Sequence, residues 1–199
     1  MMHPNTELRF VNDLVGMGVF ATAFIPAGTI TNAEDPLDIV IYPDNPALDN
    51  PLLRPQIDKY AVVEPGNRRV MSWDLSKFVN HCCQANTMST GWGFEIALRD
   101  IMPGEEIRDE YGLFNLPWTM PLTCSQSPCR GCLAHDDFER YAAQWDAQIQ
   151  VAVRQAMDVP QPLWSLLDEE TAVSLRQYIN TGEGYRSVTA LRVAHVSVP

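Results

Sequence analysis

The chain has 199 residues, of which 46% are hydrophobic and 20% are charged, and this is the composition of a globular protein with a proper core. One domain with an appendage is the natural expectation at this length. The formal net charge of −11 argues against a nucleic-acid partner, because binding a phosphate backbone requires clustered Lys and Arg. The same charge favours a basic partner, although acidity can also serve only to keep a protein in solution.

The N-terminus and the cysteines indicate the compartment. The first ten residues, MMHPNTELRF, lack a basic segment followed by a long apolar run, so we expect neither a signal peptide nor a membrane helix. We therefore expect an intracellular protein, cytoplasmic with the nucleus as an open alternative. Five cysteines lie within about a quarter of the chain, and in a reducing compartment they indicate metal binding or catalysis before disulfides.

The first half of the chain predicts short strands rather than long helices. Residues 8–30 alternate apolar runs with glycines, which predicts two or three strands around a tight Gly-Met-Gly loop at 16–18. Residues 31–66 carry six prolines and predict an insert. The further elements expected are strands at 37–42, 59–64, 93–99 and 107–111 and a short helix at 74–79.

The last third of the chain predicts a helical hairpin. From Asp136 onward, apolar residues recur at spacings of three and four, as on one face of a helix. These residues are Phe138, Tyr141, Trp145, Ile149 and Ala152. Two prolines, at 160 and 162, end this helix, and a second helix is expected at 163–179, stopping at Gly182. Residues 185–199 predict a loose tail, with an edge strand as the alternative.

The cysteines supply a candidate metal site. Cys124, Cys129 and Cys132 form a C-x4-C-x2-C loop, and Cys83 adds a distant fourth thiol. Four thiolates suit a closed, tetrahedral and structural zinc site. Cys82 could replace Cys83, but adjacent residues in an extended chain point opposite ways, so we expect only one of the two as a ligand. The alternative is a group of free buried thiols.

Three ordered motifs give the chain a resemblance to a known family. Residues 80–86, NHCCQAN, resemble the N-H-S-C-x-P-N motif of the SET-domain lysine methyltransferases. Residues 104–112, GEEIRDEYG, resemble the G-E-E-L-x-x-D-Y-G motif of the same family, and residues 16–19, GMGV, match its glycine-rich entry. The order and spacing of the three motifs agree over roughly residues 8–132.

The resemblance implies a mainly β fold. Several small twisted sheets would form it, with a pseudoknot in which the segment ending at Tyr111 passes beside the Asn-His motif. We expect a C-terminal helical hairpin after a zinc loop like the one that follows SET domains. The expected division is a SET domain at 1–115 with the insert at 31–66, a zinc-binding loop at 116–134, a helical appendage at 135–182 and a tail at 183–199.

The resemblance also implies S-adenosylmethionine as the methyl donor. Gly16, Met17 and Gly18 would then lie along the cofactor, and Asn80 and His81 would hold it through side-chain and backbone groups. A histidine such as His81, taken alone, is more often a packed core residue, and its place beside Asn80 in this motif favours the cofactor contact. In the family the cysteine of the Asn-His-x-Cys motif shares a zinc ion with the loop after the domain, which agrees with the spacing of the cysteines here.

Tyr111 would be the active-site tyrosine. A free lysine has a pKa of about 10.4, so forming its neutral nucleophile at pH 7 costs about 4.6 kcal/mol. Burial of the amine in an apolar channel offsets part of this cost, and an aimed hydroxyl would orient its lone pair. A tyrosine is a poor base at neutral pH, so positioning and electrostatic roles come first. The alternative is an ordinary strand tyrosine with its hydroxyl satisfied in the core.

Asp109 and Phe114 are the predicted substrate-binding residues. Asp109 lies two residues before Tyr111, where a Phe or Tyr of the family often governs how many methyl groups are added. Trp92 and Trp118, like Phe114, either line the site or belong to the core.

The sequence thus predicts an S-adenosylmethionine-dependent enzyme that methylates a lysine amine in a basic protein segment. One alternative keeps the fold and changes the acceptor to a small amine or an amino acid. A second alternative is a non-catalytic binding module that retains the cofactor-like pocket. We expect no direct nucleic-acid or membrane partner, and the oligomeric state stays open.

Overall fold

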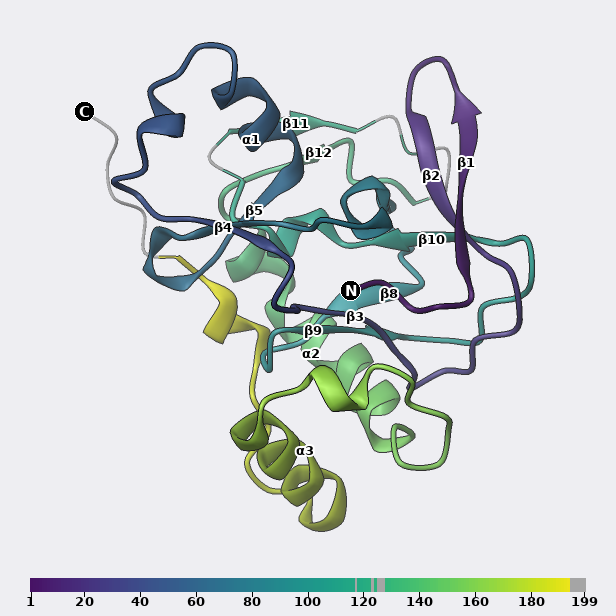
Figure 1. The fold of residues 1–199 in the computed structure, drawn as a ribbon. Coiled ribbons are helices and arrows are strands. Elements are labelled where there is room, and N and C mark those ends of the chain that lie inside the picture. Colours follow the sequence, from purple (N-terminus) through teal and green to yellow (C-terminus); the bar gives the residue numbers. More distant parts are fainter. Residues whose placement is uncertain (117, 123, 125–127, 194–199) are drawn as a thin grey trace.

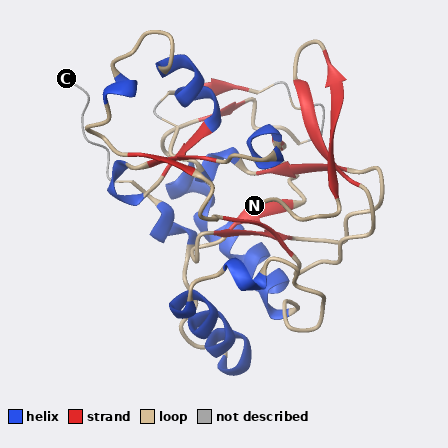
Figure 2. Ribbon diagram, viewed as in Figure 1, coloured by secondary structure: helices blue, strands red, loops and turns tan. Residues whose placement is uncertain are grey.

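Small β-sheets and three α-helices make up the described part of the protein. The structure is a computed structural model, and it describes residues 1–116, 118–122, 124 and 128–193. The sheets occupy the upper part of the view in Figures 1 and 2, with α2 and α3 below them. This architecture confirms the predicted mainly β fold with appended helices.

Four sheets bring together strands that are far apart in the sequence. The largest has the order β1 (Thr6–Asn12), β2 (Gly16–Ala21), β10 (Glu106–Asp109) and β7 (Asn80–His81). A second has the order β3 (Ile30–Ala33), β9 (Phe94–Ala97) and β8 (Thr87–Ser89). A third has the order β4 (Ile39–Ile41), β6 (Arg69–Met71) and β5 (Ala61–Val63). The fourth pairs β11 (Met120–Pro121) with β12 (Cys132–Leu133).

The helices fall mainly in the last third of the chain. The α-helices are α1 (Arg54–Tyr60), α2 (Asp137–Arg154) and α3 (Glu169–Thr181). Short 3-10 helices are η1 (Pro46–Leu48), η2 (Pro65–Asn67), η3 (Leu75–Phe78), η4 (Tyr111–Leu113), η5 (Trp164–Leu166) and η6 (Val188–Leu191). As predicted, α3 ends at Gly182, which has a φ of 75°. No described helix is long and apolar enough to cross a membrane.

Strand β10 is held between two strands from distant parts of the chain. It runs antiparallel to β2 and parallel to β7, so that Arg108 pairs with Asn80 and Asp109 pairs with His81. The loop after β7 then wraps around β10, because the Asn86 side chain donates to Glu106 O (2.9 Å) and accepts from Arg108 N (2.8 Å). This is the arrangement expected of the pseudoknot.

The glycine-rich entry belongs to a strand rather than to a loop. Gly16 to Gly18 form the start of β2, and the turn before them is closed by Asn12, whose Oδ1 accepts from the backbone N–H groups of Leu14 and Val15. The prediction of a tight loop at 16–18 is therefore wrong by a few residues. The turn lies before Gly16, because the Asn12 side chain closes it there.

The insert at 31–66 contains a helix that the sequence analysis missed. The predicted strands at 37–42 and 59–64 are confirmed as β4 and β5, but α1 occupies residues 54–60 between them. Pro55 lies in the first turn of α1, where the missing N–H costs no helical hydrogen bond. Counting prolines as helix breakers overlooked this permitted position.

The helices share a core with the second sheet. Four of the five stripe residues predicted for α2 are buried, namely Phe138, Trp145, Ile149 and Ala152, and they pack with Ile30, Phe94 and Ile96 of the sheet. Tyr178 of α3 belongs to the same core, and its hydroxyl donates a hydrogen bond to Gln150 of α2 (3.3 Å). The expectation of a core-facing helix stripe is confirmed.

Residues 185–193 pack on α2 instead of forming a loose tail. Asp146 of α2 accepts hydrogen bonds from Tyr185, Ser187 and the Val188 N–H, and Val188 is fully buried. The edge-strand alternative is wrong as well, because these residues form η6. Residues 194–199 of the predicted tail lie outside the described residues.

Replacing Ile149 tests whether α2 is part of this core. We expect Ile149→Ala to lower the free energy of unfolding by about 2–5 kcal/mol, because the side chain is fully buried. Val151→Ala on the same helix, where the side chain is 60% exposed, should change it by less than about 0.5 kcal/mol. Urea denaturation measures both values, and similar small losses for the two variants would contradict the packing of α2 in the core.

Candidate functional site

Tyr111 lies where β10 leaves the sheet and η4 begins. Its hydroxyl donates a hydrogen bond to Val79 O, and its backbone N–H donates to His81 Nδ1 (3.2 Å). Burial, followed by the charges of Asp109 and Glu95, raises the pKa of Tyr111 above its usual value of 10. The phenol therefore keeps its proton at neutral pH and can serve as a donor and a dipole, not as a base.

His81 connects Tyr111 to the cysteines. Burial, and then the charge of Arg130, lowers the pKa of His81 to about 4, so the imidazole is neutral at pH 7. Because Nδ1 accepts from the Tyr111 N–H, the ring proton lies on Nε2, which is 3.5 Å from Cys83 Sγ. A single neutral histidine thus contacts both the candidate catalytic residue and a candidate metal ligand.

Asn80 joins the glycine-rich strand to β10. Its Nδ2 donates to Met17 O (3.0 Å) and to Glu106 Oε1 (2.9 Å). A Cβ at Gly18 would lie only 2.6 Å from Glu106 Oε1, whereas a Cβ at Gly16 would meet no atom within 4 Å. Gly18 is therefore required by close packing, while the backbone at Gly16 stays open on one side.

Asp109 is fully buried and faces another carboxyl group. Its Oδ1 accepts from the Glu110 N–H (2.7 Å), while Oδ2 has no hydrogen-bond partner among the described residues. Burial and the charge of Glu95 raise the pKa of Asp109 well above its ordinary value. Burial likewise raises the pKa of Glu95.

Arg130 ties the cysteine loop to the site and to α2. Its guanidinium contacts the buried carboxylate of Glu110 and lies 3.5 Å from Asp137 Oδ2. It also lies over the rings of Tyr141 and Trp145, with centroid distances of 4.8 and 5.9 Å. Glu110 in turn accepts from the Gly112 N–H (2.8 Å) and so caps the turn that carries Tyr111.

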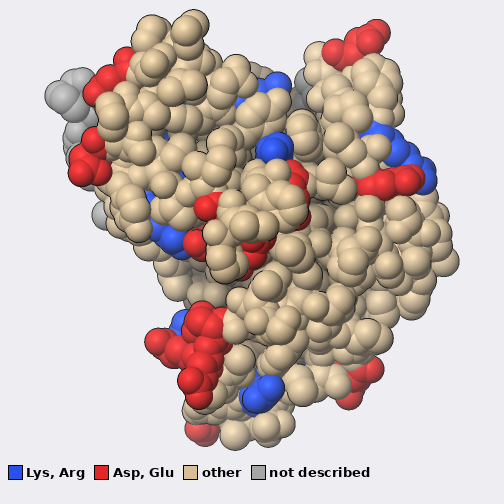
Figure 3. Space-filling model, in the orientation of Figure 1, with Lys and Arg blue, Asp and Glu red and all other residues tan. Residues whose placement is uncertain are grey.

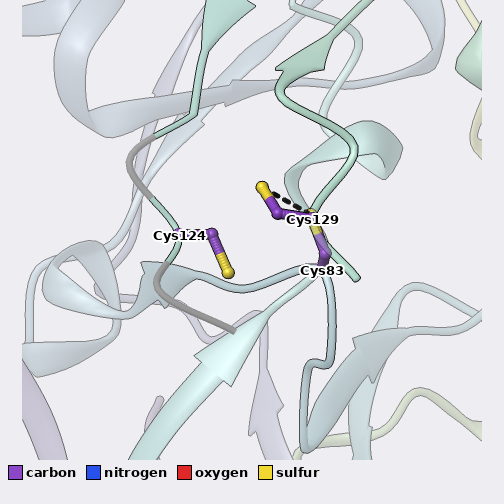
Figure 4. Close-up of side chains that lie close together, drawn as sticks. All are labelled: Cys83, Cys124 and Cys129. Atoms are coloured by element: carbon purple, nitrogen blue, oxygen red, sulfur yellow. Dashed lines mark hydrogen bonds between the residues drawn. The ribbon is translucent and has the colours of Figure 1, made fainter. Parts of the chain in front are cut away.

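Three of the four predicted metal ligands come together. The sulfur atoms of Cys83, Cys124 and Cys129 lie within 4.8 Å of one another, and Figure 4 shows them converging from the segment after β7 and from the later loop. The Cys83 and Cys129 sulfurs are 3.8 Å apart, and tetrahedral zinc with Zn–S bonds of 2.3 Å separates its sulfurs by about 3.8 Å. These thiols could hold a metal ion.

The other two cysteines differ from the expectation. Cys132 lies outside this group, so its role as a ligand stays a prediction. Cys82 was expected to point away from Cys83, yet its sulfur is 3.5 Å from that of Cys124. Both neighbouring thiols therefore contact the loop, because the chain leaves the extended conformation directly after β7. Residues 125–127 of the loop lie outside the described residues.

The predicted aromatic residues divide between the site and the core. Phe114 packs beside Tyr111 with a centroid distance of 4.9 Å. Trp92 belongs to the core, where it stacks near Phe94 and its ring N–H donates to Ser174 (3.0 Å). Trp118 is 43% exposed. Only Phe114 of the three is placed by the structure next to the candidate catalytic residue.

A pocket adjoins Tyr111 on the side of β12 and α2. Asn115, Leu133, His135 and Phe138 contribute to its lining, together with Tyr111 itself. A second hollow of about 340 Å³ lies between the insert and the residues before α3. All of the predicted site residues are among those that the structure describes. Of these residues, Tyr111 lines the first pocket, and none of them lines the second.

Comparisons with known proteins give the class of protein. Residues 16–112 match the family model of the SET domain. These residues therefore form a SET domain, which confirms the resemblance drawn from the three motifs and supports a SET-type methyltransferase.

The solved structures include the methyltransferase domain of the human histone-lysine N-methyltransferase SETMAR. This chain is similar to it with a TM-score of 0.45 and 18% sequence identity, over 67% of this chain and 58% of that chain. The match thus spans less than two thirds of that chain. A comparison with curated proteins gave no match.

Four residues of the site carried no role in the sequence analysis. Asn86 and Glu106 lay inside the recognised motifs, so their positions were available although their contacts were not. Glu95 is a single acid in an apolar strand, and Arg130 is a single base between two cysteines. A charge in such surroundings is costly unless it is paired, and this was the only signal in the sequence.

Replacing Arg130 tests its buried ion pair. We expect Arg130→Ala to lower the free energy of unfolding by about 3–5 kcal/mol, because the Glu110 carboxylate would remain buried without its partner. Arg140→Ala removes an exposed pair with Asp136 and should cost about 0–1 kcal/mol. Urea denaturation of both variants measures the difference, and equal losses would contradict a buried pair.

Proposed function

We propose that the protein transfers a methyl group from S-adenosylmethionine to the amine of a lysine in a basic protein segment. The observation that carries this proposal is the convergence of three distant motifs on Tyr111, with Asn80 and His81 paired to the strand that leads into it. The match of residues 16–112 to the SET domain supports the class of reaction. The net charge of −11 favours a basic substrate.

The residues around the glycine-rich strand fit a bound cofactor. The backbone at Gly16 is open on one side, and Asn80 fixes the adjacent Met17 carbonyl. Gly16, Met17, Gly18, Asn80 and His81 would hold S-adenosylmethionine, which supplies an electrophilic methyl group on a sulfonium.

Tyr111 would act by position and by its dipole. Its hydroxyl is fixed on Val79 O, so the ring cannot turn freely, and its proton is retained because of burial. The acceptor amine must lose its proton to solvent before it attacks. Its lone pair then forms the N–C bond while the S–C bond breaks with both electrons passing to sulfur. Asp109 and Phe114 would line the acceptor side, consistent with their places beside Tyr111.

A panel of acceptors tests the proposal. The full chain is incubated with S-adenosylmethionine and with basic proteins, lysine peptides, small amines and amino acids, and mass spectrometry detects the mass added. Methylated lysine supports the proposed function, whereas methylation of a small amine alone would favour the second acceptor class. If S-adenosylmethionine produces neither heat in calorimetry nor a thermal shift, the non-catalytic binding module is favoured.

The phenol of Tyr111 gives the sharpest single test. We expect Tyr111→Phe to lower the rate at saturating cofactor by about 100-fold or more, because a positioned hydroxyl is lost, while the Kd for S-adenosylmethionine changes little. Tyr42→Phe serves as the control, since Tyr42 is 59% exposed. An unchanged rate in the Tyr111 variant would remove Tyr111 from the catalytic residues.

We also propose that the cluster of cysteine side chains binds a structural zinc ion. Cys83, Cys124 and Cys129 supply three ligands with suitable spacing, and Cys132 is the fourth ligand predicted from the C-x2-C pattern. The Cys82 sulfur, close to Cys124, is the competing fourth ligand. Four thiolates leave no open position for water, so the ion would stabilise the loop and take no part in the transfer.

Metal analysis tests this zinc site. We expect one zinc ion per chain by mass spectrometry of the purified protein, and a lower Tm after a strong chelator removes it, because the loop loses its cross-link. Cys83→Ser should lose the metal. Comparing Cys132→Ser with Cys82→Ser identifies the fourth ligand, since only one of them should weaken binding strongly. Full zinc content in the Cys83 variant would contradict the site.

A further inference from the structure

The outer edge of β1 is open to another strand. β1 is the first strand in the order β1-β2-β10-β7, and Figure 1 shows it on the outer side of the projecting hairpin. Proteins keep edge strands from pairing with other chains by a proline, a lysine, a bulge or a very short length. Residues 6–12, TELRFVN, contain neither proline nor lysine, and the register shift in their pairing with β2 lies between Phe10 and Asn12. Residues 6–10 therefore form a regular edge without these protections.

The neighbouring strand shows which backbone groups of β1 face outward. Ala21 of β2 hydrogen-bonds away from β1, because its N–H donates to Glu105 O (2.9 Å). Thr6 lies opposite Ala21, so the backbone groups of Thr6 also point away from the hairpin. This direction alternates along a strand, so Leu8 and Phe10 share it. Outside the hairpin itself, no backbone group of the described residues hydrogen-bonds to the N–H or C=O groups of Thr6, Leu8 and Phe10.

The side chains between these positions carry opposite charges on one exposed face of β1. Glu7 and Arg9 form an ion pair, their side chains are 46% and 45% exposed, and the Arg9 guanidinium lies over the Phe20 ring at 5.2 Å. Figure 3 shows basic and acidic atoms side by side on this flank of the hairpin, on the right of the view. Phe10, whose side chain lies on the other face, is 62% exposed. The edge thus offers a partner two opposite charges, an exposed ring and outward backbone groups.

Two copies of this edge fit each other in one register. When two strands pair antiparallel about a two-fold axis at Leu8, the outward backbone groups of Leu8 meet those of Leu8 in the second copy, and those of Thr6 meet those of Phe10. Glu7 then lies opposite Arg9 of the second copy at both symmetric positions, where opposite charges stabilise the pairing. An axis at Glu7 or at Arg9 would set two like charges directly opposite each other, which is destabilising.

We propose that the chain forms a two-fold symmetric dimer through antiparallel pairing of β1 with β1 of a second copy, in the register centred on Leu8. Each facing pair of outward residues exchanges two hydrogen bonds, and the two four-stranded sheets become one continuous sheet. Tyr111 follows β10, which lies on the far side of β2 from this edge, so the dimer leaves the candidate site as it is. The inference does not depend on the proposed function.

Charge reversal tests the dimer and its register. Sedimentation velocity over a concentration series gives the Kd of the dimer for the full chain. Glu7→Arg and Arg9→Glu each set two like charges against each other at both symmetric positions, so we expect each variant to raise the Kd by about 10-fold or more. The double variant E7R/R9E restores opposite charges, and its Kd should return to within about 3-fold of the wild-type value.

A mixture of the two single variants gives the sharpest result. Opposite charges face each other at both positions only when one copy carries Glu7→Arg and the other carries Arg9→Glu. We therefore expect the equimolar mixture to dimerise at concentrations at which each variant alone is monomeric. Glu183→Arg is the matched control, because it makes the same change of charge on an exposed residue just after α3, and it should keep the wild-type Kd.

Several results would overturn the inference. One is a wild-type protein that stays monomeric at every concentration at which it is soluble. Another is a dimer whose Kd neither reversal changes and whose mixed variants show no preference for each other, because such a dimer uses another surface.

The wild-type protein decides the question if the variants fail to fold, which circular dichroism verifies. Amide hydrogen exchange is then measured at concentrations well above and well below the Kd. The N–H groups of Thr6, Leu8 and Phe10 should exchange more slowly in the dimer, because they gain hydrogen bonds across the interface. Equal exchange of these groups at the two concentrations would overturn the inference.

Discussion

The parallel pairing of β10 with β7 is the contact on which the site depends. Only two residue pairs form it, Arg108 with Asn80 and Asp109 with His81, and so short a ladder needs support. Asn86 gives that support, because its side-chain amide bonds to the backbone of β10 at Glu106 and Arg108 as a neighbouring strand would. This places His81 against the backbone of Tyr111, a residue 30 positions later in the chain.

Burial then sets the charges around Tyr111. Burial and the charge of Arg130 keep His81 neutral although a Glu110 oxygen lies 3.8 Å from its Nδ1, and a buried phenol beside acids keeps its proton. At Glu110, Arg130 lies against the carboxylate and offsets part of the cost of its burial, although burial still raises the pKa of Glu110. The site therefore combines neutral hydrogen-bonding groups with ion pairs of Arg130 and Arg108, and in the described part of the chain Glu95 and Asp109 have no basic side chain of this kind beside them.

The sequence predicted the parts of this structure that local patterns determine. The stripe of α2, the stop at Gly182 and the family followed from spacing and motif order, and all are confirmed. Helix α1 was missed because a proline in its first turn resembles a breaker. Glu95 was missed because its partner, Asp109, comes from another sheet, and no local pattern in β9 shows which strand will face it. The roles of the site residues remain predictions.

His81 connects the cluster of cysteines to the candidate active site. Its Nδ1 is committed to the Tyr111 N–H, so its only proton lies on Nε2 and faces the sulfur of Cys83. A thiolate accepts such a proton more strongly than a thiol does. Metal binding at the cysteines, which requires the thiolate, would therefore strengthen the same hydrogen bond that fixes the histidine tautomer. A metal ion at the cysteines would in this way help to orient Tyr111 through one neutral ring, without taking part in the reaction itself.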